Sequence, residues 1–227
     1  WMYENLCAIK SVMSETASIY VHLDYHIGHY VKILMDEIFG EDNFRNEIIW
    51  RRRSGALNNY KSFGQQTDTI FFYSKNDEYC FNLQKTKDSP EALEYIKERF
   101  IYDDGDGRLY SRDPVTNPSA TATPTLVYNY KGYEPPVKGW AFARKTMEEW
   151  DKAGKLYFPE DKSQRIRRKT FLDEYEGQPI QNLWTDIYVI NSQAEESVNY
   201  ATQKPEALLE RIIKASSDES MIVADFF

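Results

Sequence analysis

The feature that most constrains the fold is a change of hydrophobic pattern between residues 18 and 40. Residues 18–24, SIYVHLD, are a short β-rich run, whereas residues 28–40, GHYVKILMDEIFG, carry apolar residues at helical spacing and end at a glycine. This pattern is typical of a strand followed by a helix. Residues 44–51 and 67–74 read as further strands, and residues 2–13 as a helix. We therefore predict an α/β fold: a mixed sheet with flanking helices.

Two more strands are expected beside this sheet. Lys75, Asn76 and Asp77 predict a turn, and residues 78–83 would be the return strand of a hairpin. The last 28 residues, 200–227, read as a loop, a helix and a final apolar strand at 221–227. That strand stops where a turn into a further helix is expected.

The middle of the chain differs from the rest in composition and hydrophobic pattern, which predicts an insertion. Residues 89–100 predict a helix with Ser89 as its cap and Pro90 at its first position, and residues 103–125 are rich in loop-forming residues. Aromatic residues then crowd a segment punctuated by glycine and proline, before a helix-like run, 144–154, and a strand-like run, 155–159. We predict core segments at 1–83 and 181–227 and a loop-rich insertion at 84–180.

Composition excludes several classes of protein. No apolar run approaches the ~20 residues that span a bilayer, and the first residues lack the layout of a secretory signal, so a cytoplasmic protein without membrane contact is expected. Cys7 and Cys80 lie far apart with no metal-ligand spacing. The net charge of −8 argues against a purely electrostatic nucleic-acid binder.

Two candidate metal motifs fail on inspection. The acidic run 103–113 lacks the first and last ligands of a calcium loop and predicts a tight turn instead. His22 falls inside a strand, and His26 and His29 fall near a helix start, without a fourth ligand for zinc. No metal site is therefore predicted, and His22 is expected in or beside the core.

Basic residues form two clusters despite the acidic total. The first is Arg51, Arg52 and Arg53; the second comprises Lys162, Arg165, Arg167, Arg168 and Lys169. Each alone reads as a solvated face balanced by nearby acids. Together they indicate a polyanionic partner.

Several strings resemble one known family. These are SIYVHLDYHIGHYVKILMDEIFGEDNFRNEIIW, TDTIFFYSKND, LWTDI, YATQKPEALLERIIKASS and IVADFF. The chain resembles the permuted, adenine-specific DNA methyltransferases of bacterial restriction-modification systems, and above all the modification subunits of type III systems. The most specific string is TQKPEALLERII, at residues 202–213.

The resemblance implies an S-adenosylmethionine site. Asp225, at the tip of the expected last strand, would meet the cofactor's ammonium with Phe226 beside it, and Lys204 would pair with its carboxylate. Thr202 and Gln203 flank Lys204, and Asp24 matches a polar strand-end position of the pocket. From the residues alone, Asp225 is an ordinary strand-end residue, Thr202 and Pro205 are a helix start, and Asp24 is a turn residue.

The resemblance also implies that both ends of the machinery lie outside this sequence. The catalytic tetrapeptide, Asp-Pro-Pro-Tyr or a relative, would precede Trp1, so no catalytic residue is assigned within the chain. A Gly-x-Gly turn would follow Phe227. The chain is thus expected to be the middle of a methyltransferase and inactive alone.

The partner implied is double-stranded DNA, with a restriction subunit or a second copy as a further partner. The insertion would be the target-recognition region, with the two basic clusters on phosphates and loop side chains on base edges. A non-catalytic DNA-binding relative that keeps only the scaffold is the alternative function. A methyltransferase acting on RNA or protein is a third.

Overall fold

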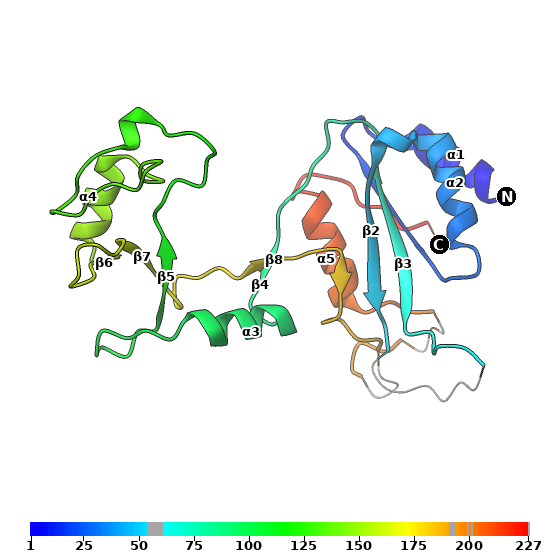
Figure 1. The fold of residues 1–227 in the computed structure, drawn as a ribbon. Helices are drawn as coiled ribbons and strands as arrows, with labels where there is room; N and C mark the ends of the chain where they lie inside the picture. Colours follow the sequence, from blue (N-terminus) through cyan, green and yellow to red (C-terminus); the bar gives the residue numbers. More distant parts are fainter. Residues whose placement is uncertain (54–60, 191–193, 199, 201, 227) are drawn as a thin grey trace. The chain divides into compact units, whose positions relative to one another are not determined.

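The computed structural model describes residues 1–53, 61–190, 194–198, 200 and 202–226 (Figure 1). The chain divides into two compact units: unit 1 comprises Trp1–Ser89 and Gln178–Phe227, and unit 2 is Pro90–Gly177. Elements of unit 1 are α1 (Met2–Val12), β1 (Ser18–Leu23), α2 (Gly28–Phe39), η1 (Glu41–Asn43), β2 (Phe44–Arg51), β3 (Thr67–Ser74), β4 (Lys85–Thr86), β8 (Gln178–Pro179), β9 (Leu183–Trp184) and α5 (Glu206–Ser216). Elements of unit 2 are α3 (Pro90–Arg99), β5 (Tyr110–Pro114), η2 (Pro124–Leu126), α4 (Arg144–Lys152), β6 (Leu156–Tyr157) and β7 (Arg167–Phe171).

The main sheet of unit 1 is mixed. Its strand order is β1-β3-β2-β9, with β1 and β2 both antiparallel to β3 and β9 parallel to β2. Consequently β1, β2 and β9 run in the same direction. The α/β class with a mixed sheet and flanking helices is confirmed.

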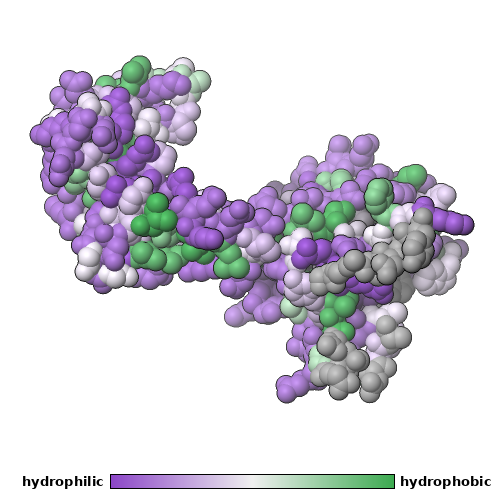
Figure 2. Space-filling model, turned by 60° about the horizontal axis from the view of Figure 1, so that its bottom comes forward, coloured by the Kyte–Doolittle hydropathy of each residue, from purple (hydrophilic) through white to green (hydrophobic). Residues whose placement is uncertain are grey.

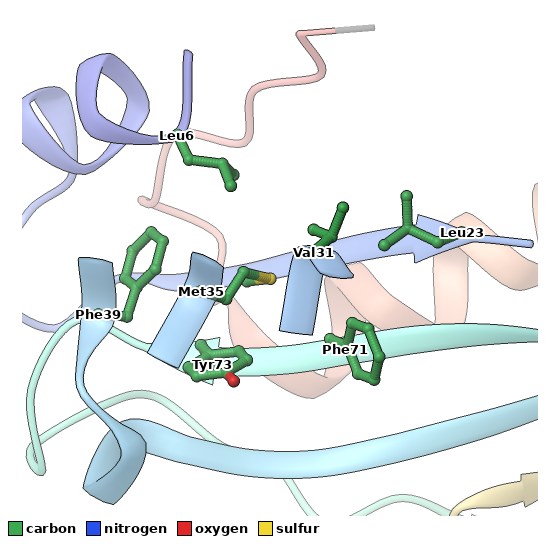
Figure 3. Close-up of a cluster of buried hydrophobic side chains, with 7 residues drawn as sticks. All are labelled: Leu6, Leu23, Val31, Met35, Phe39, Phe71 and Tyr73. Carbon is green, nitrogen blue, oxygen red and sulfur yellow. The ribbon is translucent and has the colours of Figure 1, made fainter. Parts of the chain in front are cut away.

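Helices cover both faces of this sheet. Side chains alternate between the two faces along each strand, and this alternation determines which residues contact which helices. Phe71 and Tyr73 of β3 point to the face that carries α1 and α2, where they pack with Leu6, Val31 and Met35 (Figure 3). Ile70 and Phe72, the alternate residues, pack on the other face with Leu208 of α5, Trp50 and Trp184. Alternate side chains of one strand therefore fill two separate cores.

The boundaries of α2 follow from its sequence. Val31, Met35 and Phe39 recur at a spacing of four residues and are all buried, which places one helix face against the sheet. Gly40 ends the helix with φ of +94°, a left-handed conformation that favours glycine, and its N–H donates to Asp36 O at 2.9 Å.

Unit 2 contains a smaller antiparallel sheet, β5-β7-β6, and a core of its own. Trp140, Met147 of α4, Leu156 and Ile166 are buried in that core. The segment 103–125 is mostly irregular, as expected, but contains β5 and the start of η2. β5 forms because Tyr110, almost fully buried, pairs in register with Phe171 of β7, a long-range partner that local composition does not reveal.

The acidic turn before β5 is also confirmed. Asp103 Oδ1 accepts hydrogen bonds from the N–H groups of Gly105 at 2.7 Å and Gly107 at 3.1 Å. Both glycines have positive φ, +95° and +81°. Within the described residues no group of three or more His, Cys, Asp or Glu could hold a metal ion.

Two predicted strands are wrong. Residues 78–83 are irregular, because Asn82 instead caps the end of α5: its N–H donates to Ala215 O at 2.7 Å, and its side chain donates to Lys214 O and Ser217 O. Residues 221–226 form no strand either, and Ile222 is 97% exposed. A strand needs a partner for its backbone groups, and no described strand pairs with this segment. Phe227 lies outside the described residues.

Hydrophilic residues cover most of the surface visible in Figure 2, and hydrophobic residues appear there in small groups. Among the described residues, no helix is both long and apolar enough to cross a membrane.

Candidate functional site

The carboxyl ends of β1, β2 and β9 lie at one edge of the unit 1 sheet, because these strands run in the same direction. The amino end of β3 lies at this edge too. In α/β sheets, ligands bind outside the carboxyl ends of the parallel strands. The ionisable side chains at this edge, His22, Asp24, Arg52 and Asp68, are therefore the first candidates for a functional site.

Asp68 is the centre of this group. Only 5% of it is exposed, and its Oδ2 accepts hydrogen bonds from His22 Nε2 and Arg52 Nη1, both at 3.0 Å. Burial of a carboxylate costs several kcal/mol unless cations or donors compensate it. Arg52 supplies the charge and His22 a further donor, so Asp68 joins β1 and the end of β2 to β3.

The imidazole of His22 is held in a partly buried position against Trp50, with ring centres 5.5 Å apart. Burial lowers the pKa of His22 below its ordinary value of 6.5; the hydrogen bond with Asp68 opposes this shift, and the charges of Lys204 and Arg52 add to it. Because the charge of Lys204 affects the pKa of His22, the loop before α5 lies near this same edge.

This depressed pKa gives an expected pH dependence. The unfolded chain binds the His22 proton more readily than the native state, so the contribution of His22 to stability is complete above pH 6.5 and is lost as the pH falls below that value. We expect the free energy of unfolding to fall between about pH 7 and pH 5. The variant His22→Gln should show a flatter pH profile in urea denaturation. An unchanged profile would contradict this assignment.

Asp24 lies just after β1 and is exposed. Its carboxylate accepts from the backbone N–H and from Nδ1 of His26, both at 3.0 Å. These bonds lower the pKa of Asp24, and the charge of Arg52 contributes in the same direction. Asp24 thus forms the turn expected of a strand-end residue, and its charge interacts with that of Arg52.

The loop before α5 positions Lys204. Gln203 donates from Nε2 to Glu196 O at 2.6 Å and accepts from Val198 N at 2.9 Å, which fixes the preceding segment. Lys204 Nζ donates to Thr202 O at 2.8 Å, while Thr202 itself is exposed. The helix starts one residue later than expected, after Pro205, and Glu196 accepts from the first N–H, that of Glu206.

The other two residues expected at the cofactor, Asp225 and Phe226, lie in irregular backbone after α5 and are exposed. The strand that was expected to carry them is not formed. Their role stays a prediction.

The first basic cluster does not form a single surface. Arg51 donates to Thr185 O at 2.9 Å, beside β9, and its buried Nε has no hydrogen-bond partner among the residues that the structure describes. Arg52 is paired with Asp68, and the side chain of Arg53 is exposed. Successive side chains of an extended segment point in opposite directions, so neighbours in sequence have different surroundings.

The second basic cluster is divided in the same way. Lys162 and Arg165 are exposed, and Arg165 donates to Glu134 O at 3.3 Å. The guanidinium of Arg168 stacks on Trp150 at 4.5 Å, and Lys169, with an 11% exposed side chain, is paired with Asp104. Arg167 is half-buried on β7.

Sequence reasoning missed Asp68, although one signal for it exists: an acidic residue inside an otherwise apolar strand run, TDTIFFYS. Such a residue needs a buried partner. The partner, His22, lies 46 positions earlier. Two cations, Arg52 and Lys204, and two carboxylates, Asp24 and Asp68, thus act at this edge, with Arg52 and Asp68 paired to each other.

A mixed sheet with helices on both faces, and opposite charges where its parallel strands end, is an arrangement typical of ligand-binding α/β domains. The chain belongs to the DNA methylase family, whose pattern matches residues 1–227. The resemblance seen in the sequence is thereby confirmed.

Individual relatives are similar along the whole chain. The Mod subunit of the type III restriction-modification enzyme StyLTI from Salmonella typhimurium is 25% identical over 242 residues, which cover 100% of this chain and 36% of that protein. The type II methyltransferase M.EcaI from Enterobacter cloacae is 27% identical over 229 residues, 100% of this chain and 49% of that enzyme. The EcoP15I Mod subunit from Escherichia coli is 24% identical over 267 residues, 100% of this chain and 41% of that subunit. The chain spans less than half the length of each of these relatives.

Proposed function

We propose that the chain is the scaffold of a DNA methyltransferase that transfers a methyl group from S-adenosylmethionine to the exocyclic amine of adenine. The observation that carries the proposal is the family match over residues 1–227. The charged edge of the unit 1 sheet supports it, because the methionine part of the cofactor carries an ammonium and a carboxylate.

Residues of this chain would hold the methionine part of the cofactor. Lys204 binds its carboxylate, next to Thr202 and Gln203, and Asp225 with Phe226 meets its ammonium. Asp24 adds a carboxylate at the same edge. The cofactor supplies an activated methyl group on a sulfonium, so the protein has to position the amine and needs no metal ion for the transfer.

The substrate of the proposed reaction is double-stranded DNA. The adenine amine is out of reach inside a duplex, so the base must be flipped out before transfer. Residues 84–180 serve as the target-recognition region. Of the predicted phosphate contacts, Arg53, Lys162, Arg165 and Arg167 have no carboxylate partner within the described residues, whereas Arg51, Arg52, Arg168 and Lys169 already have protein contacts. A restriction subunit, or a second copy, is the proposed protein partner.

The test is methyl transfer by the complete protein. It is incubated with S-adenosylmethionine labelled in the methyl group and with duplex DNA, and the digested DNA is examined for N6-methyladenine. Labelled adenine in DNA is expected. DNA binding without transfer would identify a non-catalytic relative, and label in RNA or protein would identify a different substrate class.

The variant Lys204→Gln tests the cofactor site in the same assay. Loss of one charged hydrogen bond to the cofactor carboxylate should raise KM for S-adenosylmethionine about 10- to 100-fold. Lys214→Gln is the matched control, since Lys214 is an exposed lysine on α5 whose partner is Glu210. Equal KM values for the two variants would show that Lys204 does not bind the cofactor.

A further inference from the structure

The small sheet of unit 2 has two unlike faces. In the antiparallel pairs of β5, β7 and β6, Arg112 lies opposite Lys169, and Arg167 lies opposite both Pro114 and Tyr157. Directly opposed residues project on the same side, and alternate residues of a strand share a side. Arg112, Tyr157, Arg167 and Lys169 therefore share one face, here named the arginine face.

The opposite face is the one that packs on the core of unit 2. Leu156 of β6 is buried there with Met147 of α4. Arg168, which alternates with Arg167 and Lys169, stacks on Trp150 of α4 at 4.5 Å. The arginine face is thus the side of the sheet that α4 does not cover.

Tyrosine rings hold Arg112 in place on the arginine face. Its guanidinium lies 3.5 Å from the ring centre of Tyr157 and 3.8 Å from that of Tyr102, well within cation–π range. Two rings in contact with one guanidinium restrict its plane. A guanidinium ordered in advance loses less conformational entropy when it binds a ligand.

Arg112 and Arg167 also differ from the cations around them in charge balance. Lys169 is paired with Asp104, Arg108 with Asp173 and Glu174, and Lys155 with Glu174. Neither Arg112 nor Arg167 has a carboxylate ion pair within the described residues. The chain has 36 acidic against 28 basic residues, so carboxylates are plentiful. The charge of Asp104 still acts on that of Arg112, but Asp104 is in direct contact with Lys169.

We propose that the arginine face is a contact surface for the DNA backbone, with Arg112 and Arg167 binding phosphates. This inference rests on the proposed function, which makes duplex DNA the substrate. A guanidinium donates two parallel hydrogen bonds to phosphate oxygens, and contacts of this kind set the position of a protein on the duplex. Arg168 and Lys169, although adjacent in sequence, do not touch the DNA, because Arg168 stacks on Trp150 and Lys169 is paired with Asp104.

The experiment measures DNA affinity of the complete protein by fluorescence anisotropy over a range of salt concentrations. Removal of one phosphate-binding side chain lowers the slope of log affinity against log salt by about 0.9. Arg112→Gln and Arg167→Gln should each lower this slope by about 0.9, and the double variant by about 1.8, on duplexes of unrelated sequence. Lys145→Gln is the matched control: it removes one charge from an exposed residue of α4, away from the arginine face.

Two further measurements separate binding from folding. Arg112→Lys keeps the charge, so its salt slope should stay near that of the parent while its affinity falls. The urea midpoint of every variant is recorded, and Arg167→Gln provides an independent test should Arg112→Gln unfold.

The outcomes distinguish this inference from the proposed function. If the parent protein binds DNA but Arg112→Gln and Arg167→Gln have the same salt slope as Lys145→Gln, the arginine face is not a DNA contact. That result leaves the proposed function standing. A parent protein with no affinity for DNA overturns the proposed function, and the assignment with it.

Discussion

Replacement of Trp50 by alanine is expected to lower the free energy of unfolding by about 3–5 kcal/mol. Trp50 is 1% exposed, and its Nε1 donates to Ile187 O at 2.8 Å. Its ring fills the core beneath α5, in the cluster that contains Ile70 and Trp184, and supports the imidazole of His22. The variant would leave a cavity and a carbonyl without its donor.

The urea midpoint of the complete protein measures this effect. Trp50→Phe keeps most of the ring and loses the hydrogen bond, so its cost should be smaller than that of alanine. Trp1→Ala removes a side chain of the same type that is 75% exposed, and should change stability by no more than about 0.5 kcal/mol. A cost below about 1 kcal/mol for Trp50→Ala would contradict the close packing of this ring.

The elements that sequence predicts correctly are those whose apolar period is strong and local. Val31, Met35 and Phe39 mark α2 without reference to the rest of the chain. The two wrong strands, 78–83 and 221–226, also have apolar side chains, but their state depends on distant backbone groups. Asn82 bonds to the end of α5, more than 130 positions away, and no described strand pairs with Ile222.

The candidate site was predictable only in part, for the same reason. Asp24 ends a recognisable strand, and Lys204 belongs to a specific string, so both could be named in advance. Asp68 could not be placed beside His22 without the register of β1 on β3, where His22 lies opposite Ile70. Sequence shows which residues can be charged; tertiary structure decides which charges are paired.

The basic clusters illustrate this limit. Arg167, Arg168 and Lys169 are equivalent as a run of charge, yet they have three different environments. Arg168 stacks on Trp150, Lys169 is paired with Asp104, and Arg167 shares its face with Arg112, a residue outside both clusters. A search for runs of charge therefore overlooks Arg112.

Replacement of Asp68 by alanine is expected to cost about 2–3 kcal/mol of stability, somewhat less than a fully buried pair because Arg52 is 38% exposed. The change removes the acceptor of both His22 and Arg52, and leaves Arg52 without its ion pair while the charge of Lys204 still acts at this edge. Asp77→Ala is the matched control. Asp77 is 89% exposed in its pair with Arg45, so its loss should cost at most about 1 kcal/mol.

A double-mutant cycle of Asp68→Ala with Arg52→Gln decides what Arg52 does. If Arg52 stabilises the edge of the sheet through its ion pair with Asp68, the two changes couple by about 1 kcal/mol or more in urea denaturation, because each removes the same interaction. The salt slope of DNA affinity then stays at the parent value in Arg52→Gln. If Arg52 instead binds a phosphate, the slope falls by about 0.9 and the coupling is small. The contact of Arg52 with buried Asp68, at 3.0 Å, leads us to expect the first result.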